Sequence, residues 1–148
     1  VSRMIYFKRY PHLLPEGDFA ARVSVEYPNT DPDAPEDFRV GLYVCDGTGA
    51  PISVIMVVSH GWLWCFSRGA SETEMRRIRE DSVPDFSPDS ATLALRLEGP
   101  MMSYCVNGAV FARENVSGYD ITNAGILVVT DRWDGVQTVY FDDFEIAY

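Results

Sequence analysis

The sequence predicts an all-β fold: an antiparallel β-sandwich of two sheets, formed by a single domain over residues 1–148. Leucines alternate with smaller or polar residues over 93–98, which is the period of a strand buried on one face. Asn107-Gly108 joins two further strand-like runs, and Asn-Gly is the strongest short hairpin signal because a type I′ turn needs positive φ at both central residues. Short strand-like segments separated by turn residues recur along the chain, as in sandwich proteins.

The first strands are expected between turns that contain proline or glycine. A strand over residues 4–10 is predicted to end at Pro11, and residues 19–27 alternate between apolar and polar positions as a half-buried strand does. Residues 28–37 contain three prolines, which exclude a helix or a central strand and predict a long loop. Residues 38–45 form the next predicted strand.

Residues 52–67 are interpreted as a hairpin that turns at His60-Gly61. A two-residue turn there predicts that Val57 pairs with Trp64. Both faces of the two strands are apolar, which is typical of strands in the middle of a sheet covered on both sides, and Trp64 is expected in the core.

The stretch from residue 68 to residue 90 is the least strand-like part of the chain. It is interpreted as an excursion over the surface, with a short helix over residues 72–80 that ends before the following prolines. Two strands are then expected to close the chain, over residues 125–130 and 138–147.

The register of the central meander predicts the core. A two-residue link at Gly99-Pro100 places Leu95 opposite Tyr104, and the Asn-Gly turn then places Tyr104 opposite Phe111. The core face is expected to collect Leu93, Leu95, Leu97, Met102, Tyr104, Val106 and Phe111. The other face is expected to be a mixed surface suited to a ligand, formed by Ala94, Arg96, Ser103, Cys105, Val110 and Ala112.

Composition and charge exclude several classes of protein. The chain is 47% hydrophobic, which excludes a disordered protein, and no apolar run reaches the roughly 20 residues that cross a bilayer. The net charge of −10 repels phosphate backbones, so nucleic acid is not an expected partner. The sequence shows neither an initiator Met nor a signal peptide, so we expect a mature form or an excised domain. The absent leader does not identify the compartment, and an extracellular or cell-surface location is only slightly favoured.

The cysteines Cys45, Cys65 and Cys105 have no metal-binding spacing. Each lies in a strand-like run, where a free cysteine is usually a small buried hydrophobe. A bridge between Cys45 and Cys105 is left open, because strand alternation turns both away from the core.

Several segments together resemble a known family of domains. They are residues 16–19 and 41–44, then Leu-Arg-Leu-Glu-Gly at 95–99, Ser-Tyr-Cys-Val-Asn-Gly at 103–108, Gly-Ile-Leu at 125–127 and Phe-Asp-Asp-Phe-Glu-Ile at 141–146. This arrangement resembles the concanavalin A-like, laminin-G-like jelly-roll domains, most closely bacterial ones that occur alone, beside glycosidase modules or appended to other proteins. The resemblance covers roughly residues 16–148 and implies glycan binding as the common role. The catalytic motifs of the family's glucanases and alginate lyases are absent, so no catalytic residue is carried over.

Two tryptophans are candidate stacking platforms for sugar rings. The apolar face of a sugar packs on an indole, and carbohydrate sites combine such a platform with nearby polar groups. Trp133 lies in a polar turn between the last two strands, and Trp62 lies beside the predicted hairpin turn. A polar groove on one sheet face is expected from Arg22, Glu26, Arg39, Tyr43, Arg96 and Ser103, and the alternative is an ordinary solvated face with cross-strand ion pairs.

Clustered acidic residues raise the alternative of a structural calcium ion, since calcium takes six to eight oxygen ligands. Asp31 and Asp33 lie in the proline-rich loop, and Asp142 and Asp143 lie in the last strand. Acidic loops are also frequent on a chain of this charge, and no EF-hand spacing is present.

We therefore expect a module that binds carbohydrate and catalyses no reaction. One alternative is a structural or protein-interaction module of a larger protein. Another is a glycoside hydrolase of the keto-disaccharide hydrolase type, for which Glu26 and Glu98 would be the carboxylates to inspect. His12 and His60 are interpreted as surface residues.

Overall fold

The computed structural model describes residues 6–14, 16–26, 39–58, 62–68, 75–82, 90–130 and 140–147. Those residues contain strands and turns but no helix. The strands are β1 (Tyr6–Leu13), β2 (Phe19–Glu26), β3 (Arg39–Asp46), β4 (Pro51–Val58), β5 (Trp62–Arg68), β6 (Met75–Ser82), β7 (Ser90–Glu98), β8 (Met101–Val106), β9 (Ala109–Asn115), β10 (Ile121–Thr130) and β11 (Tyr140–Ala147).

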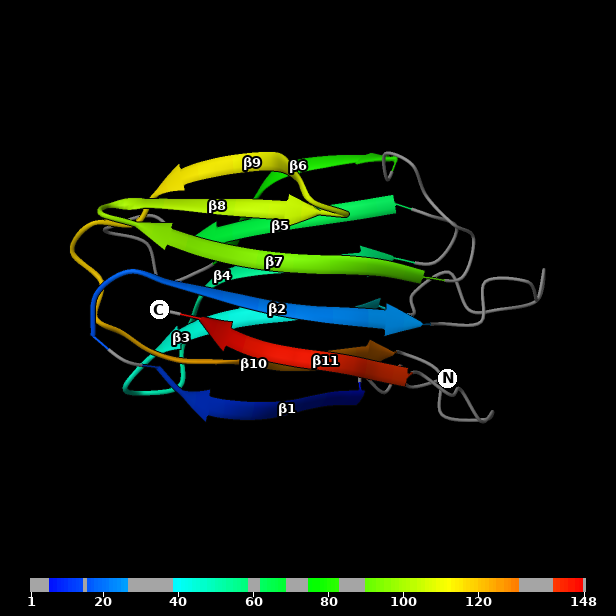
Figure 1. Ribbon diagram of the computed structural model, residues 1–148, viewed down its shortest axis with the longest axis horizontal. Coiled ribbons are helices and arrows are strands. Elements are labelled where there is room, and N and C mark those ends of the chain that lie inside the picture. The colour runs from blue at the N-terminus through cyan, green and yellow to red at the C-terminus, as the bar shows by residue number, and fades with distance from the viewer. Residues whose placement is uncertain are drawn as a thin grey trace, which may run out of the picture.

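The strands form two antiparallel sheets that stack as a sandwich, which confirms the predicted fold class (Figure 1). The six-stranded sheet has the order β1-β10-β3-β4-β5-β6, and the five-stranded sheet has the order β11-β2-β7-β8-β9. Successive strands are neighbours in β3–β6 and in β7–β9. β10 joins the six-stranded sheet between β1 and β3, and β11 joins the five-stranded sheet beside β2. The architecture is that of a jelly-roll β-sandwich.

The central meander has the predicted register. Leu95 pairs with Tyr104 across β7 and β8, and Val106 pairs with Ala109 beside the Asn-Gly turn. Asn107 has the positive φ of 49° that this turn requires. The expected pair of Tyr104 with Phe111 is wrong: a bulge between Tyr104 and Cys105 shifts the register, and Tyr104 pairs with Ala112 instead. Phe111 is the extra residue of this bulge and is still buried. The prediction that Phe111 belongs to the core is therefore confirmed although its pairing partner is not.

The main core fills the space between the two sheets. Alternation in β2 buries Phe19, Ala21, Val23 and Val25, and the leucines and Tyr104 of the meander meet them from the neighbouring strands. The six-stranded sheet contributes its inward residues, which include Val40, Leu42, Val44, Ile52, Ile55, Val57, Leu63 and Cys65. The Tyr104 hydroxyl crosses the core and donates to the carbonyl oxygen of Phe66 at 3.0 Å. Burial raises the pKa of Tyr104 to about 12.

The predicted elements are wrong around β1 and β6, and β10 begins at Ile121 rather than at residue 125. β1 continues through Pro11 to Leu13, which an edge strand permits because the missing N–H need not enter a ladder. Residues 75–80, expected in a helix, belong to β6, which pairs with β5 at the edge of the sheet and makes residues 75–82 part of the sandwich rather than a surface excursion. The local helix preference of this Met- and Arg-containing segment is overridden by strand pairing.

The hairpin between β4 and β5 is offset by one residue from the predicted register. Val57 pairs with Leu63, and Val58 pairs with Trp62, so three residues separate the strands instead of two. This slip moves Trp64 to the face opposite to the expected one, because side chains alternate along a strand. Trp64 is partly buried outside the main core, and the prediction of a core tryptophan is therefore wrong.

Arginines of β6 bridge the open edge of the sandwich between β6 and β9. Arg76 forms an ion pair with Glu114 at 2.9 Å. Arg79 donates to the carbonyl oxygen of Phe111, and its guanidinium lies 3.9 Å from the centre of the Phe111 ring. These two contacts tie the last strand of each sheet to the other sheet.

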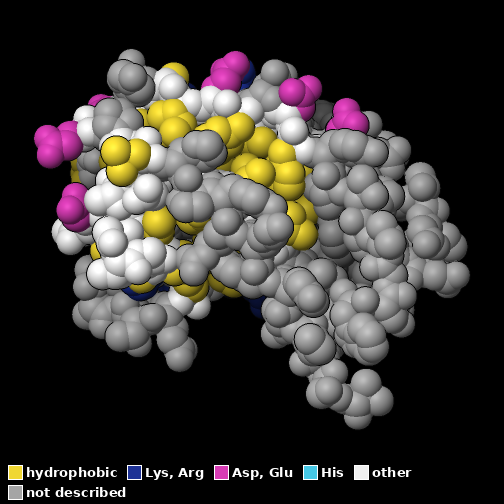
Figure 2. Space-filling model, turned by 90° about the horizontal axis from the view of Figure 1, so that it is seen from below, with side chains coloured by type: hydrophobic (Ala, Val, Ile, Leu, Met, Phe, Trp, Pro, Cys, Tyr) yellow, Lys and Arg dark blue, Asp and Glu magenta, His cyan; other side chains and the backbone are white. Residues whose placement is uncertain are grey.

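The opposite edge is formed by β1 and β11, and Figure 2 views the molecule from that side. Hydrophobic side chains of described residues are visible within this view, and Asp and Glu side chains lie at its margin. None of the described residues forms a helix of the length and apolar character that a membrane span requires.

All three cysteines are buried and free, which confirms the expectation for each of them. Cys45 lies on β3 and Cys105 on β8, strands that belong to different sheets, so the bridge left open by the sequence does not form. Cys65 lies in the main core, where burial raises its pKa to about 12.

Candidate functional site

A second hydrophobic cluster lies outside the main core, on the outer face of the six-stranded sheet. Strands β3, β4 and β5 are apolar on both faces, so the residues that do not point into the sandwich still form a hydrophobic surface. We call this surface the aromatic face and define it by Arg39, Tyr43, Val54, Met56, Trp62, Trp64, Phe66, Met75 and Arg77.

Trp64 is the centre of this aromatic face. Its indole meets the Phe66 ring edge-on, with ring centres 6.1 Å apart. The guanidinium carbons of Arg39 and Arg77 lie 4.8 and 5.1 Å from the indole centre, within the range of cation–π attraction. Arg77 also pairs with Glu80 at 3.2 Å. The face thus presents hydrogen-bond donors and an acceptor directly beside aromatic carbon.

Trp62 is the exposed tryptophan of the aromatic face. It begins β5, two residues before Trp64, so strand alternation puts both indoles on the same side of the sheet. Trp62 is 47% exposed, whereas Trp64 is partly buried. An exposed indole beside an arginine-flanked tryptophan offers a flat apolar platform next to polar groups, which is the combination that hydroxyl-rich rings require.

The residues expected to form one polar groove lie on two different sheets. Arg39 and Tyr43 belong to β3 in the six-stranded sheet, whereas Arg22, Glu26 and Arg96 belong to β2 and β7 in the five-stranded sheet. Ser103 lies on β8 of that second sheet and is buried. The single groove is therefore wrong, because two layers of core side chains separate its members.

Tyr43 faces away from the main core, as expected, but only 1% of its surface is exposed. It packs in the cluster with Cys45, Val54 and Met56. On the other sheet, Arg22 pairs with Glu145 at 2.6 Å and Arg96 pairs with Glu98 at 3.0 Å. These exposed ion pairs match the alternative of an ordinary solvated face.

Three of the predicted site residues, Trp133, Asp31 and Asp33, lie outside the described residues. Asp142 is exposed on β11, and the side chain of Asp143 is also outside the described set. Within the part of the chain that the structure describes, no three acidic, histidine or cysteine side chains come together as metal ligands. Calcium binding therefore stays a prediction.

The carboxylates named for the hydrolase alternative lie far apart. Glu26 pairs with Ser90 at the start of β7, and Glu98 is at the other end of that strand. Eight residues at about 3.3 Å each place them about 26 Å apart, against the roughly 5–9.5 Å that glycoside cleavage requires. This pair is excluded as a catalytic pair.

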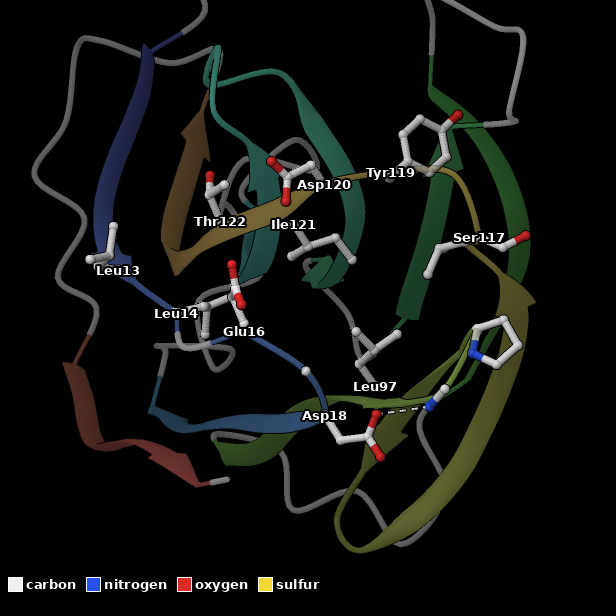
Figure 3. A pocket seen from close by; sticks show the side chains of 14 residues that line it. Leu13, Leu14, Glu16, Asp18, Leu97, Ser117, Tyr119, Asp120, Ile121 and Thr122 are labelled. Atoms are coloured by element: carbon white, nitrogen blue, oxygen red, sulfur yellow. Dashed lines mark hydrogen bonds between the residues drawn. The ribbon is translucent and has the colours of Figure 1, made fainter.

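A cavity of about 560 Å³ lies at one end of the sandwich, and sequence reasoning missed it (Figure 3). Its walls come from three connections: β1 to β2, β7 to β8, and β9 to β10. These segments are far apart in the sequence, so only the topology brings them together. Glycines with positive φ in all three, at positions 17, 99 and 118, were the available local signal of tight turns at this end.

One wall of the cavity is held by an ion pair outside it. The Arg68 guanidinium lies 5.0 Å from the ring centre of Tyr119, which lines the cavity, and donates to Asp46 at 2.8 Å. The Asp46 carboxylate also accepts a hydrogen bond from the Thr48 hydroxyl at 2.6 Å. The bonds from Thr48 and Arg68 hold the pKa of Asp46 well below its ordinary value.

We expect the Asp46→Asn variant to lose about 1 kcal/mol of unfolding free energy near neutral pH, because a charge-assisted pair is removed. A carboxyl group whose pKa is depressed on folding stabilises the protein above its unfolded-state pKa of about 3.9, and that contribution is lost as the pH falls below it. The difference between wild type and variant should therefore shrink toward about pH 3, measured by urea denaturation at both pH values. A difference that stays constant would contradict this assignment.

Comparison with known proteins identifies the fold and no family. Neither a family model nor a curated protein matches the sequence. Among solved structures, the chain is similar over its full length to 84% of carbohydrate-binding module CBM66 from Bacillus subtilis, with TM-score 0.64 and 14% identity. It is also similar to a tetrameric galectin from the ball sponge Cinachyrella sp., with 95% and 100% of the two chains covered, TM-score 0.61 and 14% identity. A third is alginate lyase A1-II′, with 89% and 62% covered, TM-score 0.65 and 10% identity.

Proposed function

We propose that this protein binds carbohydrate without catalysis and that the aromatic face is its binding surface. The observation that carries the proposal is the exposed Trp62 indole next to Trp64, whose ring is flanked by Arg39 and Arg77. Solved structures of the same fold include a carbohydrate-binding module and a galectin, which favours this class of ligand.

The proposed contacts divide between the two kinds of group on the surface. Trp62 provides the platform on which one sugar ring stacks, and the guanidinium groups of Arg39 and Arg77 donate hydrogen bonds to ring hydroxyls. Glu80, held by Arg77, accepts from a hydroxyl. Because Trp64 is held by its two arginine neighbours, its role is to position those donors rather than to stack on the sugar.

We expect the Trp62→Ala variant to lose glycan binding about tenfold or more, because truncating a central aromatic contact typically costs more than 1.4 kcal/mol. A glycan array, run with and without added calcium, first identifies a polysaccharide that the wild-type protein binds. Affinity electrophoresis in gels that contain this polysaccharide then compares the retardation of the variant with that of wild type. The array also tests whether calcium contributes.

Val110→Ala is the control, because Val110 is a hydrophobic side chain of similar exposure, 44%, on the other sheet. It should migrate as wild type does. Equal retardation of wild type and Trp62→Ala would refute the aromatic face as the site. An array without any bound glycan would refute glycan binding by the aromatic face.

A further inference from the structure

The end cavity is a candidate for a separate ligand site, because its frame is held by hydrogen bonds between the connections that form it. The backbone N–H of Gly99 donates to the Asp18 carboxylate at 2.9 Å. The N–H of Val116 donates to the carbonyl oxygen of Pro100 at 2.8 Å, and the N–H of Leu14 donates to that of Thr122 at 2.8 Å. The cavity is thus formed by the folded chain itself, and its volume of about 560 Å³ falls in the range of small-molecule sites.

The lining of the cavity combines an apolar floor with acidic and hydroxyl groups. The apolar part includes Leu14, Leu97, Val116 and Ile121. Carboxylates come from Glu16, Asp18 and Asp120, and hydroxyl groups from Ser117, Tyr119 and Thr122. In the close-up of Figure 3, the Glu16 side chain extends toward the side of the cavity that carries Asp120 and Thr122.

The charges of the residues that line the cavity determine which charge a ligand can carry. None of the described residues that line the cavity is Lys or Arg, so three carboxylates face it without a basic partner on its wall. An anionic ligand would be repelled there, and the chain as a whole carries a net charge of −10. The carboxylates also do not converge on one point as metal ligands among the described residues. A ligand that has a protonated amine attached to a larger molecule fits this distribution of charged and apolar groups.

We propose that the end cavity binds an amino sugar through its protonated amine. The ammonium group lies between the Glu16 and Asp120 carboxylates, and the carbon face of the ring rests on Leu97. The Thr122 hydroxyl, which donates to the Asn123 side chain at 2.8 Å, accepts a hydrogen bond from a sugar hydroxyl. Asp18 is already bonded to Gly99 and serves to hold the wall.

This site is distinct from the aromatic face. Trp62 begins β5 at one end of the sandwich, whereas the cavity lies at the other end, where β7 ends and β8 begins (Figure 1). The two sites can therefore be tested independently, and the proposal goes beyond the glycan binding proposed above.

The test is an NMR titration of the isotopically labelled protein with D-glucosamine at mildly acidic pH, with D-glucose and N-acetyl-D-glucosamine as the neutral analogues. We expect D-glucosamine to shift the backbone amide signals of Glu16, Asp120 and Thr122, and both neutral sugars to bind at these positions much more weakly. Glu16→Gln and Asp120→Asn should each weaken D-glucosamine binding about fivefold or more, since each removes a charge-assisted bond.

Glu145→Gln is the matched control, because it removes the same charge from an exposed position on β11 that lines neither site. It should leave the affinity for D-glucosamine unchanged, as should Trp62→Ala. Equal binding of D-glucose, equal weakening by Glu145→Gln, shifts confined to other residues, or no shifts at all would each overturn the proposal. None of these results bears on Trp62-dependent glycan retardation, so failure of one proposal leaves the other standing.

Discussion

Replacing Leu95 with alanine is expected to lower the free energy of unfolding by about 2–5 kcal/mol, the usual cost of a buried leucine truncation. Leu95 is fully buried in the middle of β7, where it pairs with Ala21 on one side and with Tyr104 on the other. Neighbours held in strands on both sides cannot move in to fill the space, so the loss includes the cavity as well as the lost burial. Urea denaturation followed by circular dichroism measures the change.

Leu13→Ala is the control for this experiment. Leu13 is 80% exposed at the end of β1, so the same chemical change removes almost no buried surface. Its unfolding free energy should stay within about 0.5 kcal/mol of wild type. Similar losses in both variants would mean that the leucines of the central meander do not lie between the sheets.

Replacing Gly41 with alanine is expected to cost about 3 kcal/mol, because the new methyl group would overlap the neighbouring strand. A Cβ atom at this position would lie 2.8 Å from the Cα of Met56 and would also overlap the carbonyl oxygen of Ile55. These are backbone atoms of β4, so the two strands must separate. Since the aromatic face lies on β3 and β4 as well as β5, we also expect weaker glycan retardation.

Gly47→Ala provides the comparison. Gly47 lies in the turn after β3, where nothing is within 4 Å of an added Cβ, and its φ is not positive. Alanine there should leave stability unchanged or raise it slightly, because it restricts the unfolded chain. Thermal unfolding of the two variants side by side would contradict the interpretation if Gly41→Ala melted at the wild-type temperature.

The parts of the fold that were predicted correctly are those in which local chemistry specifies the register. Asn107 and Gly108 supply the positive φ values of a two-residue turn, and the leucine alternation of β7 then decides which face is buried. The β4–β5 link contains no such signal, and a one-residue error in its length moved Trp64 from one face to the other. β6 was missed because its pairing with β5, not its own sequence, makes it a strand.

The candidate sites could be predicted only in part. Trp62 was identified from its place beside a turn, and its exposure agrees with that reasoning. Alternation could not assign Arg39 and Arg22 to different sheets, because residues that point outward look the same in the sequence of either layer. The end cavity depends on three connections whose closeness is a property of strand order, and strand order is not a local feature of the chain.

The arginine bridges between β6 and β9 have a consequence for many copies at high concentration. Unpaired strands at a sheet margin can recruit the same strand from another molecule and begin aggregation. Here Arg76 and Arg79 draw the two margins together and place charge along them. Copies that are held close together on a polymer, or arranged in tandem, should therefore stay separate and hydrated. If both arginines were removed, we expect the protein to lose solubility before it loses affinity for its ligand.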